Sequence, residues 1–166
     1  MNTNFKNPYL YIIFIFLCLS FNREIFGQNI SPKDVISIKV KADKSFNRNK
    51  IINLDIVLNI KDGWHLNANK PLDDYLTPTV VSLDTSNVHI IHEEYPSPSL
   101  VKLRFSQTQL ALYENEVQVK LSLKIKKGFN KPVLKLDGEV QYQPCNDQTC
   151  LFPISKPFIV ELNLKN

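Results

Sequence analysis

The chain has 166 residues, of which 43% are hydrophobic, and 20 lysines and arginines against 16 acidic residues give it a formal charge of +4. This mild positive excess is spread along the chain rather than clustered, which argues against a nucleic-acid-binding face. The length suits one ordinary domain once a short leader is set aside.

The first segment has the pattern of a targeting signal. Its apolar run, YLYIIFIFLCLSF, follows Lys6 and is shorter than the ~20 residues that span a bilayer. We expect cleavage after Gly27, which makes residues 1–27 a signal peptide and residues 28–166 a periplasmic domain. The alternative is an uncleaved N-terminal anchor. Because Cys18 would leave with the signal, two cysteines would remain in a compartment where disulfides persist.

Apolar and polar residues alternate through most of the remaining chain. In residues 52–60 every second side chain is Ile or Leu, and residues 117–126 and 158–164 repeat the pattern. This period of two is typical of strands with one buried face. Shorter strands are predicted at residues 35–40, 79–83, 88–91, 100–105 and 132–143.

Turn signals separate these strands. KDG ends at Gly63, KKGFNKP contains Gly128, and LDG ends at Gly138. The last of these turn signals divides the predicted strand region at residues 132–143 into two parts. No segment shows helical periodicity. Many short strands without helices predict an all-β fold, an immunoglobulin-like antiparallel β-sandwich formed by residues 28–166.

Cys145 and Cys150 bracket the polar loop NDQT between two strand segments. Facing residues on paired strands have Cα atoms about 4.5–5.5 Å apart, so a local disulfide is geometrically easy. A bridge that closes so short a loop removes little entropy from the unfolded chain. Spacing alone leaves a structural disulfide and a redox pair equally open. Asp147 disfavours a thiolate nearby, which suits a pair that reacts only when docked on a partner.

Two segments carry a resemblance. VQYQPCNDQTCLFP, at 140–153, resembles the active-site segment of the N-terminal periplasmic domain of DsbD, the transmembrane thiol:disulfide interchange protein. KDGWHLNANKPLDDYLTPT, at 61–79, resembles the early loop of the same family, and the similarity covers residues 36–164. The resemblance implies an immunoglobulin-like fold with one exposed, reversible disulfide. It makes Cys145 and Cys150 the redox pair and Cys150 the residue that forms mixed disulfides with partners.

In this family a cap loop with acidic residues and an aromatic ring shields the disulfide until a partner docks. The resemblance assigns that cap to Glu93, Glu94 and Tyr95, in the stretch HEEYPSPS. The two acids would keep the thiols protonated, and Tyr95 would cover the sulfurs. Tyr142, which leads into the pair, is a lesser candidate beside the site and is expected chiefly to pack.

The resemblance predicts a protein-disulfide reductase that passes reducing equivalents between a membrane or thioredoxin-like donor and an oxidised protein acceptor. Its partners would be thioredoxin-fold periplasmic proteins. Because the family's membrane and thioredoxin-like domains are not in this sequence, the donor is expected to be a separate membrane electron-transfer protein or a thioredoxin. No cofactor, nucleic acid or small-molecule substrate is expected. The alternative is a non-catalytic exported β-sandwich that binds or assembles with other proteins and has a structural disulfide.

A metal centre was weighed from the three histidines and is not expected. His89 and His92 are three residues apart in a predicted strand, so their side chains should point to opposite faces. His65 is the third histidine, and a metal site formed with the thiols is not expected either.

Overall fold

The computed structural model describes residues 30–43 and 45–165. The expected signal peptide at residues 1–27 and its cleavage point lie outside these residues. A short 3₁₀ helix, η1 (Pro32–Asp34), begins the described chain, and the other regular elements in these two ranges are strands. In this part of the protein, no helix is long and apolar enough to cross a membrane.

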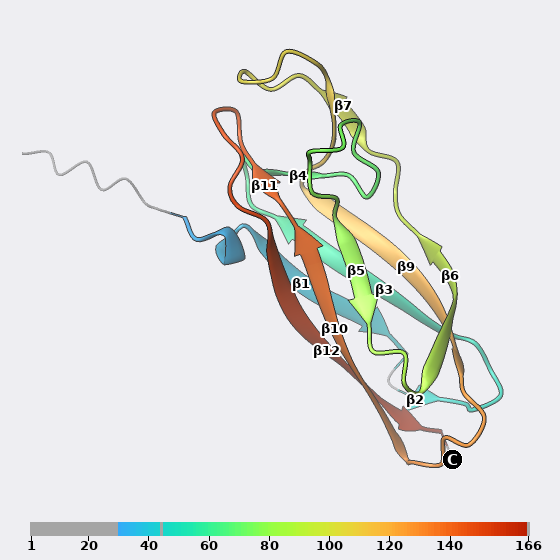
Figure 1. The fold of residues 1–166 in the computed structure, drawn as a ribbon. Coiled ribbons are helices and arrows are strands. Elements are labelled where there is room, and N and C mark those ends of the chain that lie inside the picture. Colours follow the sequence, from blue (N-terminus) through green and yellow to red (C-terminus); the bar gives the residue numbers. More distant parts are fainter. Residues whose placement is uncertain (1–29, 44, 166) are drawn as a thin grey trace, which may run out of the picture.

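Two four-stranded sheets form the body of the protein (Figure 1). The first sheet is antiparallel throughout, in the order β1 (Ile36–Ala42), β3 (Ile52–Ile60), β9 (Glu116–Ile125) and β6 (Val88–Glu94). The second has the order β2 (Ser45–Phe46), β12 (Ile154–Leu164), β10 (Val133–Tyr142) and β5 (Val80–Leu83), in which β2 runs parallel to β12.

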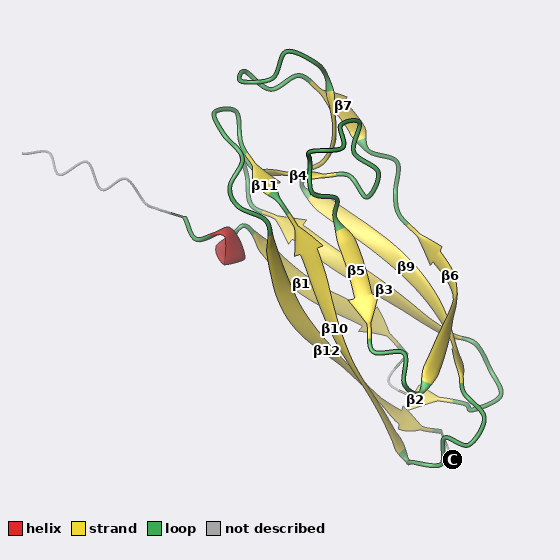
Figure 2. Ribbon diagram, in the orientation of Figure 1, coloured by secondary structure: helices red, strands yellow, loops and turns green. Residues whose placement is uncertain are grey.

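The core lies between these two sheets, which face one another in Figure 2. In β9 every second residue is buried, as the alternation of the sequence predicts. Each fully buried leucine or isoleucine contributes about 1.5–3 kcal/mol relative to an exposed one. The predicted all-β, immunoglobulin-like sandwich is therefore confirmed. Its fully buried leucines include Leu54, Leu58, Leu121, Leu123, Leu134 and Leu136.

A third, smaller sheet lies at one end of the sandwich. Its order is β11 (Pro144–Cys145), β4 (His65–Asn67), β8 (Leu110–Tyr113) and β7 (Ser99–Val101), all antiparallel. Strand β4 follows β3, β8 precedes β9 and β11 follows β10, so both large sheets contribute chain to it. Figure 1 shows β4, β7 and β11 together at this end, far from β2.

Three expectations about individual strands were wrong. The strand predicted at residues 100–105 ends at Val101, and the chain then turns so that the Ser106 amide donates to Leu103 (3.1 Å). Gly138, expected in a turn, lies inside the continuous strand β10. Strand β8 was not predicted, because all four of its residues are buried and its sequence does not alternate.

Histidines 89 and 92 share a face of β6, contrary to the sequence analysis. His89 is opposite Lys124 and His92 is opposite Ser122, two positions that point the same way on β9. The register shifts between Ile90 and His92, and such a β-bulge inserts one extra residue into the strand.

Candidate functional site

Cys145 and Cys150 form a disulfide, with an S–S distance of 2.06 Å and Cα atoms 3.9 Å apart. They oppose one another as an isolated antiparallel bridge at the mouth of a tight hairpin. On one side of the pair, the Leu151 amide donates to the Pro144 carbonyl (2.8 Å). Residue pairs between hydrogen-bonded rungs have the closest Cα atoms in an antiparallel ladder, which brings the two sulfurs together.

The loop beyond the disulfide is closed by one side chain. The Asn146 amide donates to the Thr149 carbonyl (2.9 Å), and Oδ1 of Asn146 accepts from the amides of Gln148 and Thr149 (2.9 Å each). Asparagine commonly forms such local turns. The hairpin therefore holds its shape through its own backbone and one amide side chain, as well as through the disulfide.

The two cysteines differ in exposure. Cys145 is 0% exposed, whereas Cys150 is partly exposed. Of the two, Cys150 is the one that a second protein can reach.

Buried leucines cover the inner side of the disulfide. Cys145 belongs to a small hydrophobic cluster, separate from the main core, against which Val101 and Cys150 also pack. We call it the leucine cluster, and its other buried members are Leu76, Leu103, Leu110 and Leu112. Leu76 comes from the loop between β4 and β5, and Leu103 from the loop between β7 and β8. Two loops far from the cysteines in sequence therefore close over them.

The structure places Tyr95 at the main core and not in the leucine cluster. Its hydroxyl accepts a hydrogen bond from the Val81 amide (2.9 Å) and donates one to Oε1 of Glu93 (2.9 Å). Burial, assisted by Glu93, raises the pKa of Tyr95 well above its ordinary value. Tyr95 and Glu93 thus connect β6 to β5 across the edge of the sandwich.

Glu94 lies on the surface of β6. Its carboxylate is 3.8 Å from Nζ of Lys120 and 3.7 Å from Nε2 of His92, and all three side chains are exposed. The side chains that pack around the disulfide are leucines, whereas Tyr95 packs at the main core, and a cap formed by Glu93, Glu94 and Tyr95 stays a prediction. Leu103 was missed because its segment, LVKLRF, alternates like a strand.

Tyr142 packs in the main core. It is fully buried, and its hydroxyl donates to the carbonyl of Pro32 (2.9 Å). Burial raises the pKa of Tyr142 to about 12. This is the packing role that the sequence analysis expected, and it fastens η1 to the sandwich.

Gln143 holds the disulfide hairpin in place. Its Oε1 accepts from Nδ2 of Asn67 and from the Thr77 amide (3.1 Å each), and its Nε2 donates to the Leu151 carbonyl (3.2 Å). One side chain thereby connects β4, the loop before β5 and the chain that leaves Cys150. Sequence reasoning gave Gln143 no such role, because its partners lie in distant segments.

His65 was considered only as a metal ligand, but the structure places it beside the disulfide. In the register of β4 and β11 it is the residue directly opposite Cys145. Its Nδ1 lies 3.5 Å from Oε2 of Glu114. No sequence signal shows this arrangement, because it depends on which strands of the third sheet are neighbours.

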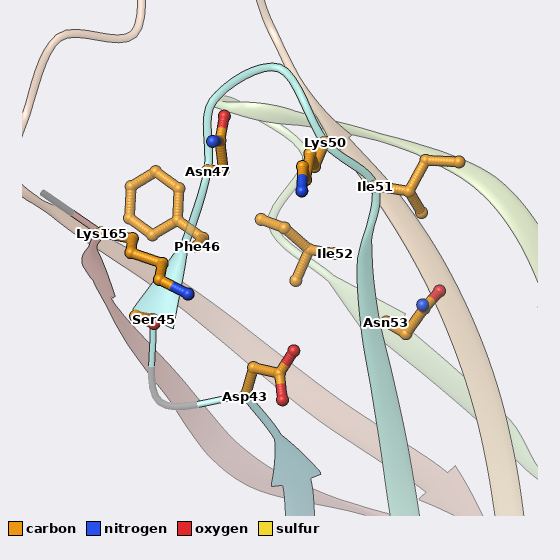
Figure 3. Close-up of a pocket in the computed structure, with 9 residues that line it drawn as sticks. All are labelled: Asp43, Ser45, Phe46, Asn47, Lys50, Ile51, Ile52, Asn53 and Lys165. Carbon is orange, nitrogen blue, oxygen red and sulfur yellow. The ribbon is translucent and has the colours of Figure 1, made fainter.

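A pocket of about 360 Å³ lies at the opposite end of the sandwich, around β2 (Figure 3). Its lining mixes charged Asp43, Lys50 and Lys165 with apolar Phe46 and Ile52. The pocket is far from the third sheet and is therefore not part of the disulfide site.

An immunoglobulin-like sandwich with a partly exposed disulfide in a terminal hairpin defines a domain of the thiol–disulfide interchange class. Residues 31–162 match the family model described as thiol:disulfide interchange protein DsbD, N-terminal. Because this match covers most of the sequence, the chain belongs to that family, and the resemblance is confirmed.

One similar solved structure is the N-terminal periplasmic domain of ScsB from Proteus mirabilis, with a TM-score of 0.54 and 19% identity. The alignment covers 81% of this chain and 49% of that one, so this chain spans about half the length of the neighbour. At this identity the likeness shows a shared fold. No curated protein matches the sequence.

Proposed function

We propose that this protein is a periplasmic thiol–disulfide exchange module that passes reducing equivalents to an oxidised protein through the Cys145–Cys150 disulfide. One observation carries the proposal: the two cysteines form a disulfide in which Cys150 is accessible and Cys145 is buried. Membership of the interchange family supports the same chemistry.

The exchange proceeds in two balanced steps. A thiolate of the electron donor attacks Sγ of Cys150, and the bond to Cys145 breaks with its electron pair on the Cys145 sulfur. A second donor thiol then attacks its neighbour in the mixed disulfide, which leaves the donor oxidised and both cysteines reduced. With an oxidised acceptor the same steps run in reverse: Cys150 attacks, and Cys145 resolves the mixed disulfide.

The leucine cluster takes the shielding role first assigned to Tyr95. It packs against both cysteines and restricts the approach of small reagents to the inner side of the disulfide. Thiol exchange depends on access to the attacked sulfur as well as on thiolate reactivity. The pair would therefore react quickest with a protein that docks at this end of the sandwich.

Exposed apolar side chains on the segments near the disulfide suit such docking. Phe152, two residues after Cys150, is 88% exposed. Aromatic side chains of this kind often anchor protein interfaces. These side chains belong to the segments that carry Cys150 and the covering leucines, and they are Leu72, Tyr75, Leu100, Phe105 and Phe152.

The partners proposed are thioredoxin-fold proteins of the periplasm, with a membrane electron-transfer protein or a thioredoxin as donor. Export by a cleaved signal at residues 1–27 would bring the domain to that compartment. The family to which the chain belongs supports exchange with such partners, since its description is that of a thiol:disulfide interchange protein. The similar solved structure is a periplasmic domain, which supports the compartment.

A redox titration against glutathione tests the proposal. Structural disulfides of secreted proteins have potentials below about −300 mV, whereas exchangeable ones are more oxidising. We expect the Cys145–Cys150 couple to equilibrate with glutathione buffers above that value, as measured by alkylation of the free thiols and mass spectrometry. A bridge that stays oxidised throughout would support the alternative, a non-catalytic binding module with a structural disulfide.

A further inference from the structure

Three side chains with acid–base or thiol chemistry lie in a row across the third sheet. Cys145 on β11 is directly opposite His65 on β4. On the other side of β4, Leu66 is opposite Tyr113, so the next position brings His65 opposite Glu114 at the end of β8. Directly opposite residues point to the same face, with Cβ atoms about 4.5–5.5 Å apart.

The hydrophobic packing independently identifies this face. Asn67, two residues after His65 on β4, is opposite Leu112. Because alternate residues share a face, His65 and Leu112 lie on the same side of the sheet. Leu112 and Cys145 both belong to the leucine cluster, so the imidazole lies on the side of the sheet that the cluster covers.

Two residues in left-handed backbone conformations form the bends next to His65 and Glu114. Gly63 has φ of 76° in the turn that leads into β4, and Asn115 has φ of 60° between β8 and β9. Glycine and asparagine are the residues that most readily adopt this conformation. The Asn115 carbonyl also accepts from the Ile60 amide (2.7 Å), which holds the end of β3 against this junction. His65 and Glu114 therefore follow and precede fixed bends.

The imidazole is nearly enclosed. The His65 side chain is 15% exposed, and its Nδ1 is buried and without a hydrogen bond inside the described chain. Glu114 Oε2, 3.5 Å away, is the charged group beside it from the residue after β8, and Cys145 is the titratable group opposite it on β11. Asn67, on the same face of β4, is an uncharged amide. A carboxylate next to Nδ1 favours a proton on that nitrogen and leaves Nε2 for proton transfer.

Cys145 needs such a group when its disulfide is reduced. Its sulfur must leave as a thiolate, yet Cys145 is 0% exposed and packs among leucines. A thiolate in apolar surroundings lacks the solvation that stabilises its charge. A proton delivered as the S–S bond breaks removes this obstacle.

We propose that His65, oriented by Glu114, is the acid–base residue of Cys145. This inference rests on the proposed function. When a donor thiolate attacks Cys150, the imidazolium of His65 gives its proton to the departing Cys145 sulfur, and neutral imidazole and a Cys145 thiol remain. In the reverse direction, neutral His65 takes the thiol proton as Cys145 attacks the sulfur of Cys150 and releases the acceptor's thiolate. Each step moves one proton and one electron pair, and no further reactant is needed.

Dithiothreitol serves as the test reductant, with the purified full mature chain in the wild-type and His65→Gln forms. Rates are measured by acid quench, alkylation and mass spectrometry between about pH 5 and pH 8, where imidazole changes charge. The wild-type to variant rate ratio at each pH cancels the ionisation of the reagent. We expect a ratio of about 10–100 at the acidic end, up to the lower limit typical of general acid catalysis, and this ratio should fall towards one as pH rises.

His92→Gln is the matched control. His92 also lies near a carboxylate, 3.7 Å from Glu94, but on the exposed surface of β6. Its removal should leave rates and pH profile unchanged. Glu114→Gln keeps the imidazole but removes the neighbouring charge. The ratio of the wild-type rate to the rate of this variant should therefore be smaller than the ratio for His65→Gln, with the same pH dependence.

The outcomes separate this inference from the proposed function. Equal rates and equal pH profiles for wild type and His65→Gln overturn the inference, whatever the potential of the disulfide. A potential below about −300 mV overturns the function, whatever the kinetics. Should His65→Gln fail to fold, Glu114→Gln decides the matter, because Glu114 is an exposed residue. A wild-type profile in that variant then counts against the inference.

Discussion

At the scale of single residues, Tyr142 shows how one polar atom is accommodated in an apolar core. Its ring is fully buried, while its hydroxyl donates to the Pro32 carbonyl (2.9 Å). Burial is the main cause that raises its pKa to about 12, and Asp34 adds to it. A tyrosine that ionises in the unfolded chain but not in the native state makes stability depend on alkaline pH.

We predict a pH-dependent cost for Tyr142→Phe. The native pKa of about 12 exceeds the ordinary value of 10, so the contribution of Tyr142 is complete below pH 10 and is lost towards pH 12. At pH 8 the variant should lose about 1 kcal/mol with its hydrogen bond. Near pH 11 the difference should shrink by on the order of 1 kcal/mol. Urea unfolding at both pH values measures this, and a pH-independent difference would refute the explanation.

At the scale of elements, β10 depends on a residue without a side chain. Gly138 lies between β5 and β12, opposite both Leu83 and Phe158. A Cβ atom there would lie 2.5 Å from Cζ of Phe158 and 2.8 Å from Cδ2 of Leu83. This glycine makes room for two neighbours in the middle of a sheet, although in sequence it looked like part of a turn.

Gly138→Ala should therefore destabilise the fold by about 1–3 kcal/mol, the usual range for an overpacked site. Chemical denaturation of the variant beside Glu139→Ala, at the next and exposed position of β10, measures the difference. The control should change stability by less than about 0.5 kcal/mol, as most surface substitutions do. A Gly138→Ala protein as stable as wild type would mean that Phe158 can move aside without cost.

Whether a strand could be predicted from the sequence depended mainly on its length. The long alternating strands β3, β9 and β12 were predicted, because one buried and one exposed face leave a clear period. The short strands β4 and β11 were not, because their pairing depends on neighbours that other segments supply. The residues of the site show the same contrast between predicted and unpredicted features. The two cysteines are close in sequence and their pairing was predicted, whereas Leu103 and His65 reach them only through tertiary contacts.

At the scale of the whole molecule, the disulfide contributes little to the fold. It joins residues only five positions apart, and the main core between the two large sheets is formed by other residues. A chain-entropy treatment gives about 2 kcal/mol for so short a loop, less than half the value for a loop of about 100 residues.

We predict that reduction lowers the free energy of unfolding by no more than about 2 kcal/mol. The reduced domain should keep its far-UV circular dichroism and a single unfolding transition. Urea denaturation with and without reductant measures the difference, and the Cys145→Ala/Cys150→Ala double variant provides a reference that cannot re-oxidise. A loss of fold on reduction would contradict this prediction and indicate a structural bridge.

The separation of the leucine cluster from the main core has a consequence for motion. Proteins open in cooperative local units, and regions with few buried contacts open at a lower free energy than the whole. The disulfide hairpin rests on a few leucines and one glutamine side chain, whereas Leu66 of β4 and Ala111 and Tyr113 of β8 belong to the main core. Amide protons of β11 and of the loops that carry Leu76 and Leu103 should thus exchange sooner than those of β3, β9 and β10. The hairpin could then loosen around a docking protein and close again while the body stays folded, so the proposed thiol exchange would not require global unfolding.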